Sequence, residues 1–197
     1  MSYPTQDPNQ QPQYPAAPAY AAPAVGGVPG PGEPFDGAAS PDQLNRPLYG
    51  ASFGQAVKRF FKNYANFKGR ASRSEYWWVA LFTFLIELIP LILYIIGLSL
   101  MAGGAIASAD SSGNFTTTPA SEAAIGGGAV LFTIGLILLI VIGLAILIPS
   151  LAIAWRRLHD ANFAGPFWFL SLTSVGSIIV LIFTLLPPKP EGRRFDV

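Results

Sequence analysis

The polar residues best suited to chemistry lie in the stretch 148–170, IPSLAIAWRRLHDANFAGPFWFL, between two long apolar runs. Arg156 and Arg157 stand there with His159, the one histidine of the chain, and Asp160. An arginine pair binds phosphate or a lipid headgroup, and a histidine titrates near neutral pH. Alternatively, the arginines mark the cytoplasmic side of a membrane protein, and Asp160 pairs with Arg157 one helical turn earlier. We favour the structural ion pair over headgroup binding, and headgroup binding over catalysis.

Residue spacing places Arg157 differently from Arg156. On a helix of about 3.6 residues per turn, Arg157 falls on one stripe with small residues, whereas Arg156 falls to the side. Small residues let a neighbouring helix approach closely, so Arg157 is expected to point into the bundle and Arg156 to mark the cytoplasmic side. In this interpretation His159 has no structural role. The small residues of the stripe are Gly128, Gly135, Gly143, Ser150 and Ala154.

A second charged group stands in GRASRSEYWW, just before the first apolar run. Its arginines are expected on the same side of the membrane as the arginine pair, and Glu75 is a further candidate partner for a buried Arg157. The binding hypothesis combines both groups into one cytoplasmic-face cluster that recognises an anionic lipid headgroup or a small anion. Its members are Arg70, Arg73, Glu75, Arg156, Arg157, His159 and Asp160.

Glu87 is an ionisable residue inside an apolar run. It lies about 16 Å beyond Tyr76 along a helix, near the middle of a bilayer. Ionisable groups at that depth are costly and mark proton or cation paths. A protonated Glu87 could instead donate to the carbonyl of Ile86, which Pro90 deprives of its helical hydrogen bond, or to a hydroxyl such as that of Thr133. No second acidic residue lies in the apolar runs, which disfavours a proton relay.

Composition excludes several classes of function. Only 12% of the residues are charged and 51% are hydrophobic, whereas a soluble domain has about 25% charged residues. Without cysteine and with one histidine, the chain has no disulfide, no thiolate chemistry and no multi-histidine zinc site. No Ser/His/Asp set stands at a plausible spacing, and lipid explains the basic stretch without nucleic acid. We expect a membrane protein without metal or cofactor, and not an enzyme.

Three apolar runs determine the expected fold, because each is long enough to cross the roughly 30 Å of bilayer hydrocarbon. Residues 1–47, rich in Pro, Gln, Ala and Tyr, predict a disordered tail. The predicted class is all-α integral membrane: the tail, an amphipathic helix, and a three-helix transmembrane bundle within residues 72–197. The three spans are expected at about 76–101, 125–154 and 166–186.

Two capping boxes mark predicted helix starts. Ser52 with Gln55 opens the stretch 52–68, and Ser72 with Glu75 opens the first apolar run. Within 52–68, aromatic and apolar residues recur at steps of three and four, with basic residues on or beside the other face. Such a helix lies at a membrane interface and is drawn to anionic lipids, or else packs on its own protein; we favour the interface.

The distribution of lysine and arginine predicts the orientation. Six basic residues stand between positions 58 and 73, none between 102 and 124, and two in the RRLHD stretch. By the positive-inside rule, the N-terminus and the RRLHD loop are cytoplasmic and the 102–124 loop is outside. Three crossings would place the basic tail PPKPEGRRFDV outside, which conflicts with the rule. A re-entrant third run would instead return the C-terminus to the cytoplasm.

Two signatures, YANFKGRASRSEYWW and RRLHDANFAGPFWFL, together resemble the bacterial inner-membrane family called domain of unknown function eight hundred and five. The resemblance covers about residues 53–197. Pro166 and Phe167 interrupt the Gly-Trp-Trp of the second motif, and GRRFD at 192–196 departs from the closing motif. The matched residues are Phe67, Gly69, Arg70, Arg73, Glu75, Tyr76 and Trp77, then Arg156, Arg157, Leu158, His159, Asp160, Ala164, Gly165 and Trp168.

The resemblance implies a small bacterial plasma-membrane protein with no established activity. With the residues themselves, it favours a multi-pass, non-enzymatic protein of the inner membrane with a cytoplasmic N-terminus. Its expected partners are the lipid bilayer, including anionic lipids, and a protein that binds the proline-rich tail. Headgroup or small-anion binding or transport is the alternative function. The oligomeric state is left open.

Overall fold

The structure is a computed structural model that describes residues 37–109 and 112–196. This part of the chain is helical and forms no β-strand, apart from an isolated bridge between Ala109 and Phe115. Most of the predicted tail, residues 1–36, lies outside the described residues. The elements are α1 (Phe53–Lys62), α2 (Arg73–Ser108), α3 (Pro119–Asp160), η1 (Gly165–Leu172), α4 (Ser174–Leu185) and η2 (Pro190–Phe195), of which η1 and η2 are 3₁₀ helices.

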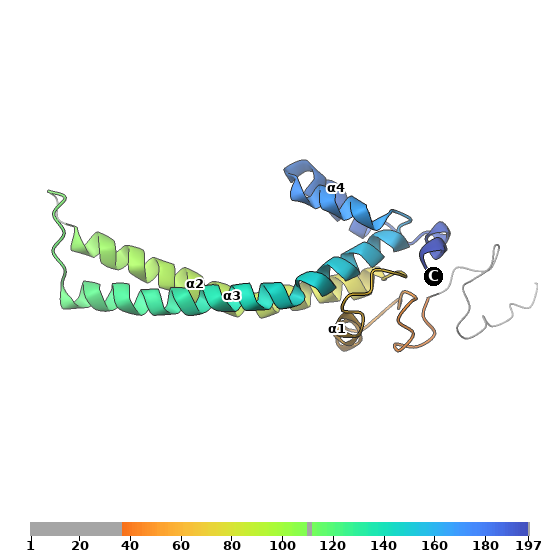
Figure 1. Ribbon diagram of the computed structural model, residues 1–197, viewed down its shortest axis with the longest axis horizontal. Helices are drawn as coiled ribbons and strands as arrows, with labels where there is room; N and C mark the ends of the chain where they lie inside the picture. Colours follow the sequence, from red (N-terminus) through yellow and green to blue (C-terminus); the bar gives the residue numbers. More distant parts are fainter. Residues whose placement is uncertain (1–36, 110–111, 197) are drawn as a thin grey trace, which may run out of the picture.

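Helices α2 and α3 form a long antiparallel hairpin (Figure 1). They contain 36 and 42 residues, hence lengths of about 54 and 63 Å. Both are long and apolar enough to cross a membrane. The predicted capping box of Ser72 and Glu75 opens α2 and is confirmed.

Glycines allow the two long helices to approach closely. A Cβ added to Gly135 would lie 2.5 Å from the backbone nitrogen of Tyr94, and one added to Gly128 would lie 2.7 Å from the carbonyl oxygen of Gly97. The predicted stripe of small residues therefore faces α2 at Gly128 and Gly135, and Ala154 is buried further along it. Gly143 has open space instead.

The third apolar run differs from the expected single span. It folds into η1 and α4, separated at Thr173, whose hydroxyl accepts from the backbone N–H of Gly176 and so caps α4. With 8 and 12 residues, they reach about 16 and 18 Å, and neither can cross a bilayer. The backbone N–H of Lys189 donates to the carbonyl of Asp160 at 2.8 Å. The chain therefore returns to the end of α3 from which it left (Figure 1).

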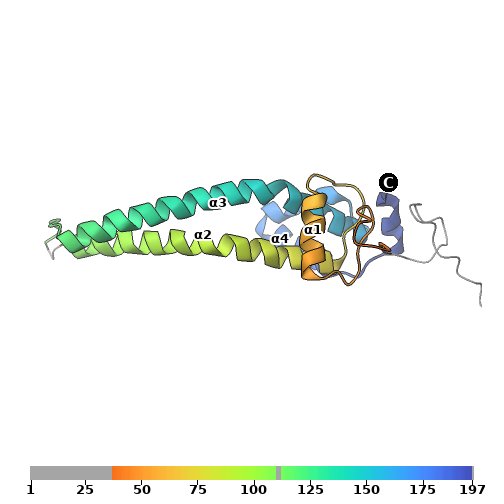
Figure 2. The same cartoon turned by 90° about the horizontal axis from the view of Figure 1, so that it is seen from below.

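Helix α1 crosses the end of the hairpin (Figure 2). Its capping box of Ser52 and Gln55 is confirmed, but the helix ends at Lys62, earlier than the predicted 68. Ala56 and Phe60 are buried against the protein, whereas Phe53 and Phe61 remain exposed. The helix thus packs on its own protein, and the rings of Phe53 and Phe61, which both contact Phe82 of α2, stay partly exposed.

Pro149 creates a second attachment between the α1 region and α3. Proline has no N–H, so Pro149 leaves the carbonyl of Ala145 without its helical donor. The hydroxyl of Tyr64 donates to this carbonyl at 2.5 Å. The Ala145 carbonyl that Pro149 leaves without a donor thereby accepts from Tyr64 and attaches the segment after α1 to α3.

Several residues of the predicted tail, before its boundary at residue 47, pack against the rest of the protein. The backbone N–H of Ala38 donates to the carbonyl of Pro47 at 2.8 Å. The carbonyl of Leu48 accepts from the Ser72 hydroxyl at 2.7 Å, and Pro47 is fully buried. Residues 38–49 are therefore part of the folded unit.

Candidate functional site

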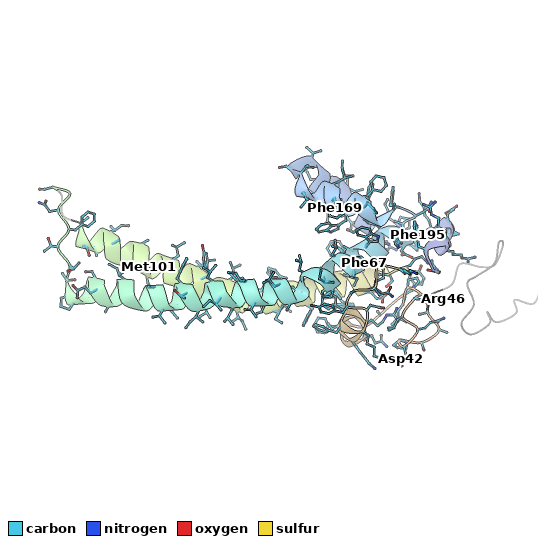
Figure 3. All side chains as sticks on the ribbon, viewed as in Figure 1. Asp42, Arg46, Phe67, Met101, Phe169 and Phe195 are labelled. Atoms are coloured by element: carbon cyan, nitrogen blue, oxygen red, sulfur yellow. The ribbon has the colours of Figure 1, made fainter. Side chains whose placement is uncertain are left out.

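The charged residues converge where α1, the start of α2, the end of α3, η2 and the segment 41–49 meet. Figure 3 shows Arg46, Phe67 and Phe195 at this end of the molecule, with Met101 far along the hairpin. We call the converging charged and polar side chains the polar junction. Its members are Tyr49, Arg59, Arg70, Glu75, Arg156, Arg157, His159, Asp160 and Asp196.

Asp160 is the central carboxylate of the polar junction. Nη1 of Arg157 donates to its Oδ2 at 3.0 Å, and the Tyr49 hydroxyl donates to its Oδ1 at 2.9 Å. Nη1 of Arg70 lies 3.7 Å from Oδ1. The predicted pair of Arg157 and Asp160 is therefore present, with both side chains 0% exposed. Burial, followed by the charge of Asp160 and the hydrogen bond to it, raises the pKa of Tyr49.

Arg157 also joins α3 to the end of α4. Its Nε donates to the carbonyl of Thr184 at 3.0 Å, and its Nη2 donates to the carbonyl of Leu186. The last carbonyls of a helix have no donor within the helix and carry partial negative charge. The buried guanidinium of Arg157 supplies both a donor and a positive charge. Arg157 thus fixes the point at which the chain returns from α4.

Arg70 holds the C-terminal segment. Its Nε and Nη2 donate to the two carboxylate oxygens of Asp196 at 2.7 and 2.5 Å, in a bidentate pair. Burial is the largest effect on the pKa of Arg70 and lowers it, but the hydrogen bond to Asp196, together with the charges of Asp196, Tyr49 and Asp160, outweighs burial and raises the arginine pKa. Sequence reasoning placed Arg70 in the cluster and missed Asp196, which lies 126 residues away.

Glu75 is bound to Arg59 rather than to Arg157, its candidate partner from the sequence. Nε of Arg59 donates to Oε1 of Glu75 at 2.5 Å. The other oxygen, Oε2, accepts from the backbone N–H groups of Ser72 and Leu48, both at 2.9 Å. The remaining nitrogens of Arg59 donate to the carbonyls of Pro41, Gln43 and Arg46.

His159 has a structural role, contrary to the expectation from the sequence. Its Nδ1 lies 3.0 Å from the carbonyl oxygen of Gly69, and its ring stacks on Phe195 at 3.9 Å between centroids. As the carbonyl can only accept, Nδ1 carries the proton. The backbone N–H of Gly69 donates to the carbonyl of Phe195 at 2.7 Å. The φ angle of Gly69 is +76°, in the left-handed region that favours glycine. A side chain at Gly69 would be strained there and would collide with Asn45.

Arg156 is buried as deeply as Arg157, not exposed at the side. It is 1% exposed, because the junction surrounds the end of α3. Its Nε donates to the carbonyl of Ala152 in its own helix at 3.3 Å. No described carboxylate forms an ion pair with it, and Glu75 supplies its main favourable charge. Arg156 is thus a buried cation that the nearby charge of Glu75 and one hydrogen bond within its own helix stabilise.

Two predicted residues lie apart from the polar junction. Arg73 is exposed at the start of α2 and forms no ion pair in the part of the chain that the structure describes. Glu87 is half-buried along α2, and its carboxylate has no hydrogen-bond partner among the described residues. No described group of His, Asp and Glu could hold a metal ion.

Sequence reasoning missed three members of the polar junction, Tyr49, Arg59 and Asp196, and also Phe195, which stacks on His159. Arg59 looked like one basic residue on the polar face of an amphipathic helix, and Tyr49 stood beside the predicted tail. The signal for the other two was the sequence RRFD at the C-terminus, which pairs an aromatic ring with an acid in an otherwise basic tail.

Comparison with known proteins places this arrangement in a family. The "Inner membrane protein YhaH" of Escherichia coli strain K12 is 29% identical over 143 residues, which cover 70% of this chain and 89% of the relative. The protein of the same name from Escherichia coli O157:H7 matches equally. No solved structure matches. A family model described as "Protein of unknown function (DUF805)" matches residues 64–197, so the chain belongs to the DUF805 family.

Proposed function

We propose that the protein is a non-enzymatic, multi-pass protein of the bacterial inner membrane whose polar junction locks a membrane hairpin and presents the N-terminal segment to cytoplasmic partners. The observation that carries this proposal is the internal use of the arginines. Arg59, Arg70 and Arg157 are 2%, 0% and 0% exposed, and their donors serve carboxylates and carbonyls of the same chain. A substrate would have to displace these bonds.

The basic residues support a cytoplasmic position for the junction. Lys58, Lys62, Lys68 and Arg73 are exposed at this end, whereas residues 102–124 carry no lysine or arginine. The positive-inside rule then places the N-terminus in the cytoplasm. The exposed rings of Phe53 and Phe61 beside these cations suit a helix at the inner leaflet. The proline-rich residues before 37 fit a partner that binds polyproline II.

The alternative function, headgroup or anion binding by the whole predicted cluster, is less well supported. Of its arginines only Arg73 is exposed, while Arg70 and Arg157 are bound to Asp196 and Asp160. The two readings differ in the expected effect of removing Arg157.

The test compares Arg157→Ala with Arg73→Ala by thermal unfolding in detergent micelles. We expect Arg157→Ala to destabilise the protein by about 3 kcal/mol or more, because the buried Asp160 loses one of its two donors and the carbonyls of Thr184 and Leu186 lose the guanidinium that they accept from. Arg73→Ala, on the surface, should remain within about 0.5 kcal/mol of the parent. An unchanged melting temperature for Arg157→Ala, with loss of bound phosphatidylglycerol, would contradict the proposal and favour the alternative.

A further inference from the structure

A pocket of about 200 Å³ lies between the hairpin and η1, close to the polar junction. One wall comes from α2, a second from α3 and a third from Trp168 of η1. Figure 1 shows η1 and α4 diverging from the hairpin. The lining residues place the pocket where η1 meets the two long helices. Its lining residues are Tyr76, Val79, Ala80, Thr83, Leu147, Ser150, Leu151, Ile153, Ala154 and Trp168.

The lining is apolar except for a few hydroxyls. The hydroxyls of Tyr76 and Ser150 have no hydrogen-bond partner among the described residues, whereas that of Thr83 donates to the carbonyl of Ala80. The pocket extends from Tyr76, at the start of the apolar run, to Thr83, about 10 Å further along the helix. It therefore begins at the level of an aromatic belt and continues into the hydrocarbon region.

A positive charge without a described carboxylate partner stands just before the Tyr76 end of this pocket. Arg73 is one helical turn before Tyr76 on a neighbouring part of the same α2 face. Its guanidinium is exposed, and it pairs with no described carboxylate. It lies close enough to Arg157 for their charges to repel. An anion at this position would relieve the repulsion.

We propose that this pocket binds one anionic phospholipid of the inner leaflet, with part of an acyl chain between α2, α3 and η1 and the phosphate on Arg73; the choice of leaflet rests on the cytoplasmic position proposed for the polar junction. The apolar lining matches the chain, the hydroxyls of Tyr76 and Ser150 match the ester region, and Arg73 matches the headgroup charge. The pocket is smaller than the roughly 300–1,000 Å³ typical of small-molecule sites. It suits a segment of a lipid already in the membrane, which fills the space between two diverging arms.

The experiment measures lipid retention by native mass spectrometry, with the full chain purified in detergent micelles. The probes are dioleoyl phosphatidylglycerol and dioleoyl phosphatidylcholine, added separately. We expect the parent to retain phosphatidylglycerol in preference to phosphatidylcholine. Arg73→Gln should lower this preference about fivefold, the effect of one cation near a lipid surface. The melting temperature should not change, because Arg73 is exposed.

Two variants fill the pocket from opposite walls. Ala80→Leu from α2 and Ser150→Leu from α3 should each lower retention of both lipids, and either one suffices if the other does not fold. The matched controls are Ala105→Leu, an exposed alanine far along α2, and Lys189→Gln, an exposed cation in the segment after α4. Both should retain lipid as the parent does. Unchanged retention in the folded pocket-filling variants overturns the proposal. Displacement of the lipid by free glycerol phosphate also overturns it, because the site would then bind the anion alone.

Discussion

At the scale of single residues, burial in the polar junction gives structural roles to side chains whose types suggest chemistry. His159 resembles a titrating group of an active site, yet its ring lies between the Gly69 carbonyl and Phe195 with 6% of its surface exposed. Its Nδ1 proton is committed to a backbone acceptor. A proton shuttle needs a ring that a reacting group can reach, so the geometry assigns His159 to the attachment of the C-terminal segment.

Substitution of His159 tests this structural assignment. His159→Phe keeps a flat ring against Phe195 but leaves the buried Gly69 carbonyl without its donor. We expect a loss of about 1–3 kcal/mol in the free energy of unfolding, measured by denaturant titration in micelles. Phe195→Leu is the complementary variant, because it removes the stacking and keeps the hydrogen bond; we expect about 0.5–1.5 kcal/mol. Full stability of His159→Phe would contradict the assignment.

The residue contacts that could be predicted are the local ones. Arg157 and Asp160 are three positions apart on one helix, so the sequence alone brings their charges together. Arg70 and Asp196 are 126 positions apart, and their pairing depends on where the chain goes after α4. The sequence offered Glu75 as a partner for Arg157, and the packing of α1 instead brings Arg59 to it.

At the scale of elements, hydropathy predicted the two long helices and did not predict the break in the third apolar run. The apolar content of a segment shows how much surface the segment can bury, but it does not show whether the segment forms one uninterrupted helix. The break follows from contacts: Thr173 caps α4, and Gly176 packs against the carbonyl of Leu170, where a side chain would collide. Arg157 then binds the carbonyls at the far end of α4.

The hairpin interface offers a matched pair of glycines. Gly135→Ala places a methyl group 2.5 Å from the backbone nitrogen of Tyr94 and 2.9 Å from the carbonyl oxygen of Pro90. Backbone cannot rotate away, so the helices must separate, and we expect a loss of about 1–3 kcal/mol. Gly143→Ala meets open space and should be neutral or stabilise the helix by up to about 1 kcal/mol. Thermal unfolding of both variants checks this, and equal melting temperatures would contradict close packing at Gly135.

At the scale of the whole molecule, one end of the hairpin is held by several segments. Residues 38–49, α1, the start of α2, the end of α3 and η2 all meet at the polar junction, whereas among the described residues the far end of the hairpin is joined by the connection between α2 and α3 (Figure 1). The arrangement is a hairpin of two helices, each long and apolar enough to cross a membrane, that is anchored by one folded end. This end also contains the C-terminal segment, through Arg70 with Asp196 and through Lys189 with Asp160.

The position of the C-terminal segment determines a topology that three crossings would not give. Because η1 and α4 are each too short to cross a bilayer and the chain returns to Asp160, we expect residue 197 on the same side as residue 37, in the cytoplasm. This also removes the conflict of a basic tail outside the cell. Reporter fusions at residue 197 check it: green fluorescent protein should fluoresce and alkaline phosphatase should be inactive. A phosphatase inserted after Gly113, in the loop between α2 and α3, should be active and serves as the control. Active phosphatase at residue 197 would mean that the third apolar run crosses the membrane and that the contacts of Arg157 with α4 do not form in the bilayer.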